Sequence, residues 1–313
     1  MNKLEKAIFK TLGFYSILNR PLTMDELWRF LYGASASKLQ VFIATEKLIK
    51  QDIIFKKNDY FVLRGRETII DDFIKRRELN RKRWGKVSWV VKIISILPFV
   101  KNISIINSLS YNNSRDDSDI DLLIVAKKNR LWTARAFTIL TLEILGQNKN
   151  TWYQANKFCL GFAFDETRLD LSKIRYRDDI DFIYWLANLD PIFDRGIYKD
   201  LILQNQWLKE ELPNWEEKRI KMQISPMLRS ESDRKRRTNL KMIERLLGGK
   251  FGDGIENWFS KIQINRIRKD PKNKRKDASV IADSNMMKLH PYDKRKLRHN
   301  IWLDLTKKLN KIK

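Results

Sequence analysis

Apolar side chains recur at helical spacing near the start of the chain. A first helix with one buried face is predicted by four residues three to four positions apart: Leu4, Ile8, Leu12 and Tyr15. Thr23 and, three residues later, Glu26 form a capping-box pattern, which predicts the start of a second helix. Residues 37–51 predict a third helix, and two short β-type runs at 53–55 and 60–63 predict a hairpin.

The order helix, helix, helix, hairpin over residues 1–66 is that of a winged helix-turn-helix. In such a module the third helix can lie against nucleic acid, where Lys38, Lys47 and Lys50 would contact phosphates. A packing or protein-docking role is the alternative, because helices of globular proteins commonly carry surface lysines. The pattern leaves both roles open.

Beyond this module the pattern changes twice. Residues 67–100 are first highly charged and then apolar, which predicts connector helices that end by packing on the next domain. Residues 101–215 contain a helical pattern at 131–145 between β-type runs, which lie at 103–106, 120–125 and 157–164. Strands and helices in this order predict a compact α/β or α+β unit, of which we expect the α+β class.

The charge of the chain changes the picture of its last third. There are 63 Lys and Arg residues against 38 Asp and Glu residues, a formal net charge of +25 with a pI near 10.0. Residues 218–313 hold 28 of the basic residues and 10 of the acidic ones. Such an excess indicates a polyanionic partner such as nucleic acid. We therefore expect residues 216–313 to form a basic, mostly helical region.

Composition also excludes several classes of site. The single cysteine, Cys159, cannot form an intramolecular disulfide, and with two histidines a zinc site of the usual kind is not expected. A metal would have to be a hard ion held by carboxylates. The start of the chain has no signal-peptide pattern, and the longest apolar stretch, residues 87–100, is too short to cross a bilayer. We expect a cytoplasmic protein without a membrane partner.

Two aspartates begin the run 120–125. Side chains alternate along a strand, so Asp119 and Asp121 project from the same face, with Ile120 on the other. Two adjacent carboxylates repel each other unless a cation lies between them, and Mg²⁺ accepts one or two carboxylates together with the phosphates of a substrate. Asn107 and Ser108 end the previous strand, where the serine hydroxyl and nearby N–H groups could meet phosphate oxygens. The alternative is a solvated turn without a ligand.

The residues at 107–108 and 119–121 resemble a known sequence motif. Asn107-Ser108, ten intervening residues and Asp119-Ile120-Asp121, followed by an apolar run, resemble the signature of the polymerase-beta-like nucleotidyltransferase superfamily, which is Gly-Ser followed by Asp-x-Asp. The longer segments 108–135, 157–166 and 280–296 resemble an uncharacterised bacterial subgroup whose members also have an N-terminal winged helix. The resemblance covers most of the chain, although only the serine and the two aspartates are specific to the motif.

The resemblance implies a mixed sheet on which Asp119 and Asp121 hold two Mg²⁺ ions, and a reaction that transfers a nucleoside monophosphate from a nucleoside triphosphate. Two residues depart from the motif. Asn107 replaces the glycine, although asparagine tolerates positive φ better than most residues. No carboxylate lies within the later strand at 158–164, so Asp165, at its end, is the candidate for the third acidic residue.

Basic clusters interleaved with aromatic residues in the last third can grip a phosphate backbone and stack on unpaired bases. The candidates for nucleic-acid contact are Arg234, Lys235, Arg236, Arg237, Lys274, Arg275, Lys276, Lys294 and Arg295. Together these observations predict a Mg²⁺-dependent nucleotidyltransferase whose acceptor is RNA, such as a tRNA-like end. The alternatives are a nucleic-acid-binding regulator that has lost catalysis, and a protein-modifying enzyme of the toxin-antitoxin type for which the winged helix docks a partner protein.

Overall fold

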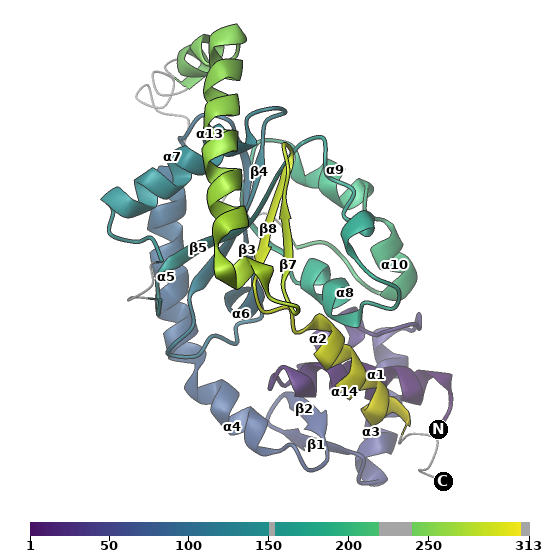
Figure 1. The fold of residues 1–313 in the computed structure, drawn as a ribbon. Helices are drawn as coiled ribbons and strands as arrows, with labels where there is room; N and C mark the ends of the chain where they lie inside the picture. The colour runs from purple at the N-terminus through teal and green to yellow at the C-terminus, as the bar shows by residue number, and fades with distance from the viewer. Residues whose placement is uncertain (150–153, 219–239, 308–313) are drawn as a thin grey trace.

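The computed structural model describes residues 1–149, 154–218 and 240–307. Its centre is a six-stranded mixed sheet with helices on both faces, as Figure 1 shows, so the expected α+β class is confirmed. Within the described ranges, no helix combines the length and the apolar composition that crossing a bilayer requires.

The sheet has the strand order β6-β3-β4-β5-β8-β7. Its strands are β3 (Val100–Ile106), β4 (Ile120–Ala126), β5 (Phe158–Asp165), β6 (Asp190–Asp194), β7 (Ser279–Ala282) and β8 (Met286–His290). The pair β4 and β5 is parallel, and every other pair is antiparallel. The parallel pair requires a crossover, which α7 (Leu131–Ile144) provides.

Strand β4 is buried on both of its faces. Leu123 and Val125 belong to a core that also holds residues of α1 (Lys3–Ile17), α8 (Ile180–Ala187) and α9 (Tyr198–Leu203). The alternate residues Leu122 and Ile124 belong to a second core, formed with α5 (Arg77–Ile94), α7 and α13 (Lys250–Lys269). The period of two along the strand therefore requires a helical layer on each face.

The first part of the chain has the predicted order of elements, with α1, α2 (Met24–Arg29) and α3 (Lys38–Lys50) preceding a hairpin of β1 (Ile54–Lys57) and β2 (Tyr60–Leu63). Thr23 and Glu26 form the predicted capping box at the start of α2. This unit is not separate from the sheet, because its buried residues are part of the same core as Leu123 and Val125.

Other described elements are α4 (Thr68–Lys75), α6 (Asn107–Ser110), α10 (Trp207–Glu211), α14 (Arg295–Lys307) and the 3₁₀ turns η1 (Ser172–Ile174) and η2 (Pro271–Lys274). In Figure 1, α4 and α5 run along one side of the molecule and join the N-terminal unit to the sheet.

The C-terminal segment differs from the expected basic region attached to a core that ends at residue 215. Strands β7 and β8 extend the central sheet beyond β5, and α14 packs on α1 and α8. The sequence pattern missed this arrangement because β7 and β8 are short and β8 pairs with β5, a strand more than a hundred residues earlier.

A buried carboxylate joins α13 to α7. The residue before α7 is Arg130, which cannot accept a hydrogen bond from the first turn and makes no side-chain cap. Glu256 of α13 takes that role: its carboxylate oxygens accept from the backbone N–H groups of Trp132 and Thr133, each at 2.8 Å. The Thr133 hydroxyl donates to the same carboxylate. A negative charge at this end of a helix is also favoured by the helix dipole.

Replacing this cap should destabilise the protein. We expect Glu256→Ala to lower the free energy of unfolding by about 2 kcal/mol, because two buried N–H groups lose their acceptor. Glu256→Gln should lose less, since one oxygen remains. Urea unfolding followed by circular dichroism measures both. Glu143→Ala, at an exposed position of the same helix α7, is the control; an equal loss for that variant would contradict the capping role.

Candidate functional site

The two aspartates lie where β4 begins. Ile120 is buried in the core with α5 and α7, and by alternation Asp119 and Asp121 project to the opposite face, the side of α8. Both side chains are partly exposed. Asp121 pairs across the sheet with Ile106, the last residue of β3, so Asn107 follows directly beside it.

A cysteine completes the cluster. Parallel pairing places Cys159 of β5 opposite Asp121. One ligand atom from each of Asp119, Asp121 and Cys159 lies within 4.8 Å of the others, a spacing that could hold a metal ion. Carboxylate oxygens suit hard divalent ions, whereas a sulfur ligand suits softer ones. The donor set therefore fits a divalent cation, although a thiol occupies the third position.

Charges at the cluster are partly balanced by the protein itself. The Lys149 ammonium lies 2.5 Å from Oδ2 of Asp119 and forms an ion pair with it. Burial, together with the neighbouring Asp119 carboxylate, raises the pKa of Asp121 to about 7. Burial also raises the pKa of the Cys159 thiol to about 12. Negative charge at Asp121 is thus costly without a cation nearby.

Asn107 adopts a backbone conformation that glycine favours. Its φ is +58°, in the left-handed region, which asparagine tolerates better than most residues. Its side-chain oxygen accepts from Nε1 of Trp185 at 3.1 Å, and its side chain also hydrogen-bonds to Asp121. The Ser108 hydroxyl lies 3.3 Å from that of Ser114. Asn107 therefore connects the carboxylates to α8.

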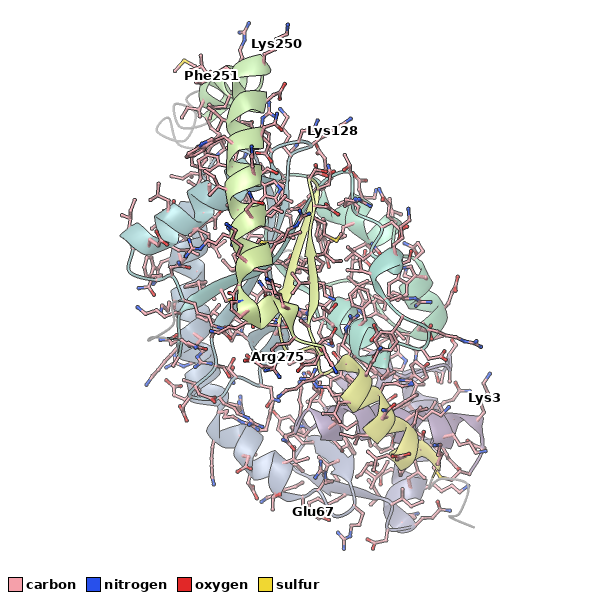
Figure 2. All side chains as sticks on the ribbon, viewed as in Figure 1. Lys3, Glu67, Lys128, Lys250, Phe251 and Arg275 are labelled. Atoms are coloured by element: carbon pink, nitrogen blue, oxygen red, sulfur yellow. The ribbon has the colours of Figure 1, made fainter. Side chains whose placement is uncertain are left out.

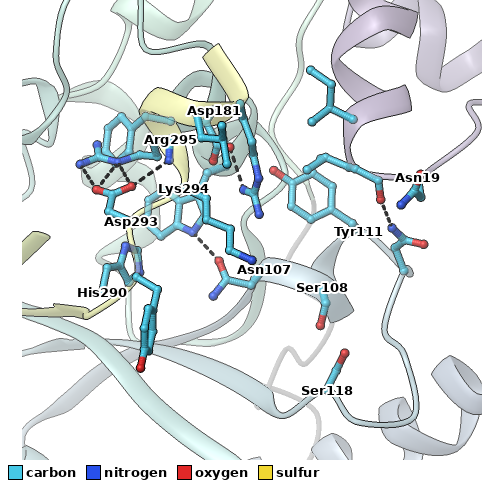
Figure 3. Close-up of a pocket in the computed structure, with 18 of the residues that line it drawn as sticks. Asn19, Asn107, Ser108, Tyr111, Ser118, Asp181, His290, Asp293, Lys294 and Arg295 are labelled. Atoms are coloured by element: carbon cyan, nitrogen blue, oxygen red, sulfur yellow. Dashed lines mark hydrogen bonds and ion pairs between the residues drawn. The ribbon is translucent and has the colours of Figure 1, made fainter. Parts of the chain in front are cut away.

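A cleft of about 620 Å³ opens on the other side of Asn107 and Ser108. Its walls come from the end of α1, from α6 and α8, and from the segment between β8 and α14 (Figure 3). In this view Lys294 points toward Asn107, and Ser108 and Ser118 face each other. Segments that are far apart in sequence thus meet around one hollow beside the aspartates.

Arginines near the cleft are largely engaged within the protein. Arg295 forms ion pairs with Asp179 at 2.8 Å and with Asp293 at 2.7 Å, and Arg298 forms one with Asp181 at 2.7 Å. Lys294 differs, since it is exposed and has no ion-pair partner in the part of the chain that the structure describes. The nucleic-acid role of Arg295 stays a prediction, although its guanidinium is already paired with the buried Asp179 and the partly buried Asp293.

Two further basic groups of the cleft have lowered pKa values. Burial lowers the pKa of His290 to about 4, and the charge of Lys288 acts in the same direction. Burial likewise lowers the pKa of Lys288 to about 8, and its ammonium donates to the Ser279 hydroxyl at 2.7 Å. His290 is therefore an uncharged imidazole at neutral pH.

Asp165 is not part of the cluster, so its assignment as the third acidic residue is wrong. It lies at the far end of β5, opposite Ala126, whereas Asp121 lies opposite Cys159, six residues earlier. Six residues of a strand span about 20 Å. The buried Asp165 carboxylate accepts instead from the backbone N–H of Asn129 and Thr167, at 3.0 Å each, and fixes a turn.

The other basic candidates are dispersed. Lys274 ends η2, and Lys276 is exposed near it. Arg275 forms an ion pair with Asp277 and lies over the ring of Tyr292, 4.6 Å from its centroid. The cluster of Arg234, Lys235, Arg236 and Arg237 lies outside the described residues.

On the third helix of the N-terminal unit, two of the three lysines named for phosphate contact are paired, whereas Lys50 is exposed without an ion-pair partner among the described residues. Lys38 pairs with Asp25, and Lys47 pairs with Glu5 at 2.7 Å. Between them the helix exposes apolar side chains, namely Leu39, Phe42 and Ile43. This surface favours docking on protein over contact with a phosphate backbone.

Sequence reasoning missed two residues of the cluster. Cys159 had a usable signal, because it opens the strand that follows the crossover from β4, but only the register places it beside Asp121. Lys149 precedes residues outside the described ranges, and its contact with Asp119 had no sequence signal. Comparisons with known proteins add no assignment: no family model, no curated protein and no solved structure matches the chain.

The low pKa of His290 predicts a pH dependence of stability. The folded state holds the imidazole neutral down to about pH 4, whereas the unfolded chain binds a proton below about pH 6.5. Stability should therefore fall as pH drops through 6.5 toward 4, because the unfolded state binds more protons. We expect the melting temperature of His290→Gln to fall less than that of the wild type when the pH is lowered from 7.5 to 5.0. Parallel melting curves with identical losses would contradict this assignment.

Proposed function

We propose that the protein is a nucleotidyltransferase that uses a divalent cation to transfer a nucleoside monophosphate from a nucleoside triphosphate to an acceptor. The observation that carries the proposal is the convergence of Asp119, Asp121 and Cys159 beside Asn107 and Ser108, which themselves line the large cleft. A group of side chains that could hold a metal ion and a cleft with polar walls, side by side, are what a metal-bound nucleotide requires.

The cleft has the size and lining for a nucleotide. Its volume of about 620 Å³ is within the usual range for small-molecule sites. Lys294 offers an ammonium group without an ion-pair partner among the described residues, and Ser108 and Ser118 offer hydroxyl groups. We place the triphosphate along this wall, where it would approach the aspartates.

Asp119 and Asp121 would hold the divalent ion, which is expected to be Mg²⁺, with two ions as the resemblance implies. Bound there, the ions would lower the pKa of the acceptor hydroxyl and neutralise the triphosphate. Asn107 orients Asp121 through its side-chain hydrogen bond, and Lys149 would release Asp119 when the cation binds. The acceptor oxygen attacks the α-phosphate, and pyrophosphate leaves.

RNA is the proposed acceptor, because the net charge of +25 favours a polyanion. A protein acceptor, as in toxin-antitoxin enzymes, is the alternative favoured by the exposed apolar face of α3. A catalytically inactive nucleic-acid-binding regulator is the alternative favoured by the Lys149–Asp119 ion pair and by the thiol at the third position. The cytoplasm remains the proposed compartment.

The proposal predicts transfer of label from triphosphates. Purified protein incubated with α-labelled nucleoside triphosphates, Mg²⁺ and total RNA or protein should label one of the two acceptors. Asp119→Asn and Asp121→Asn should each abolish labelling, because the amide removes the charge that binds the cation. Asp117→Asn is the matched control, since Asp117 is exposed in the same loop. The proposed activity would be contradicted if the double variant Asp119→Asn, Asp121→Asn labelled as much as the wild type. It would also be contradicted if the wild type released no pyrophosphate with any acceptor.

Because Cys159 belongs to the cluster, its substitution should change the metal preference of the site. Cys159→Asp supplies the third carboxylate opposite Asp121 and should raise Mg²⁺-supported labelling about tenfold relative to Mn²⁺-supported labelling, a change equal to about 1.4 kcal/mol in barrier height. Cys159→Ser, which adds no charge, is the control. Melting temperatures measured with and without Mg²⁺ establish that each variant is folded. An unchanged metal ratio would show that this position does not reach the cation.

A further inference from the structure

A helical hairpin at one end of the molecule exposes large apolar side chains. Residues 240–246 form a helix that precedes α13, and the two are joined by the turn 247–249. We define the hairpin surface as five exposed side chains: Met242, Leu246, Phe251, Trp258 and Ile262. Leu246, Phe251 and Trp258 are 68%, 73% and 61% exposed. In Figure 2, Lys250 and Phe251 lie at the tip of the molecule.

The exposed stripe of α13 is separate from the face by which the helix packs. Phe251, Trp258 and Ile262 are spaced by seven and four residues, so they share one side of the helix. The packing side carries Glu256, which caps α7, and Ile267, which is buried in the core. Phe259, next to Trp258, contacts Phe137 of α7. The helix therefore has two apolar sides, of which the core uses one.

The acidic and basic residues of the hairpin also differ in their surroundings. Its three acidic residues are engaged with the sheet domain: Glu244 with Arg195, Asp253 with Arg130, and Glu256 with the start of α7. Its basic residues are all exposed, namely Lys241, Arg245, Lys250, Lys261, Arg266, Arg268 and Lys269. The outer surface of the hairpin is consequently apolar and mainly cationic, since Asp253, the one exposed carboxylate among residues 240–269, is paired with Arg130.

We propose that the hairpin surface binds a lipid membrane of negative surface charge. Cationic groups would be attracted to anionic headgroups while the apolar side chains enter the boundary with the acyl chains. Three of the five apolar residues, Met242, Leu246 and Ile262, are aliphatic and cannot stack on nucleic-acid bases, which favours lipid over RNA at this place. Binding of this kind needs no membrane-spanning helix, and the described residues contain none.

The proposal is independent of the proposed function, because the hairpin tip lies at the opposite end of the sheet from the N-terminal unit that borders the cleft (Figure 1). A variant that no longer binds membrane should therefore keep any nucleotide transfer. Failure of either proposal leaves the other intact.

Vesicle co-sedimentation tests the proposal with the full chain. The protein should sediment with phosphatidylcholine vesicles that contain about 30% phosphatidylglycerol and stay in solution with phosphatidylcholine alone. The double variant Leu246→Ser, Phe251→Ser should bind at least about tenfold more weakly at equal charge. Leu203→Ser, at an exposed leucine of α9, should bind as the wild type does. Unchanged binding of the double variant, or binding to RNA but not to vesicles, would overturn the proposal.

A second measurement reports insertion directly. In a Cys159→Ser background, an environment-sensitive dye attached at Phe251→Cys should shift its emission to the blue with phosphatidylglycerol vesicles. The same dye at Leu203→Cys should not shift. Melting temperatures equal to that of the wild type would show that the exposed substitutions leave the fold intact. Equal responses at the two positions would contradict insertion of the hairpin.

Discussion

Burial of β4 on both faces is the constraint on which the rest of the molecule depends. A strand in the middle of a sheet whose alternate residues are all apolar needs a layer of helices on each side. The helices α5, α7 and α13 supply one layer, and α8, α9 and the N-terminal unit supply the other. At the start of the strand Ile120 is buried, whereas the side chains of Asp119 and Asp121 are only partly buried.

The free-energy cost of holding two negative carboxylates side by side explains several contacts around them. Asp121 is destabilised as a carboxylate by burial and by Asp119, and a hydrogen bond from Asn107 and the charge of Lys149 offset part of that cost. Such an arrangement lowers stability at a place that could hold a cation. Asn107 in the left-handed region is part of the same compromise, since it turns the chain directly from β3 into the wall of the cleft.

The large positive charge divides into unlike parts when it is placed on the structure. Arg295 and Arg298 bind carboxylates of the interior and fasten the C-terminal segment to α8. Lys294 extends into the cleft, whereas the lysines and arginines of the hairpin face outward beside apolar side chains. The net charge does not separate these groups, because it is a single sum in which each internal ion pair cancels and only the excess of cations remains.

Local patterns in the sequence determined the elements that depend on neighbouring residues. The Thr23–Glu26 capping box, the three N-terminal helices with their hairpin and the shared face of Asp119 and Asp121 follow from spacing alone. Tertiary structure decided everything that depends on pairing between distant segments. The register of β4 with β5 placed Cys159, not Asp165, beside Asp121, and the pairing of β8 with β5 brought the segment with His290 and Lys294 to the cleft. Glu256 caps a helix that begins more than a hundred residues earlier. Such contacts arise from the burial of whole surfaces, so no short stretch of sequence contains the information that selects them.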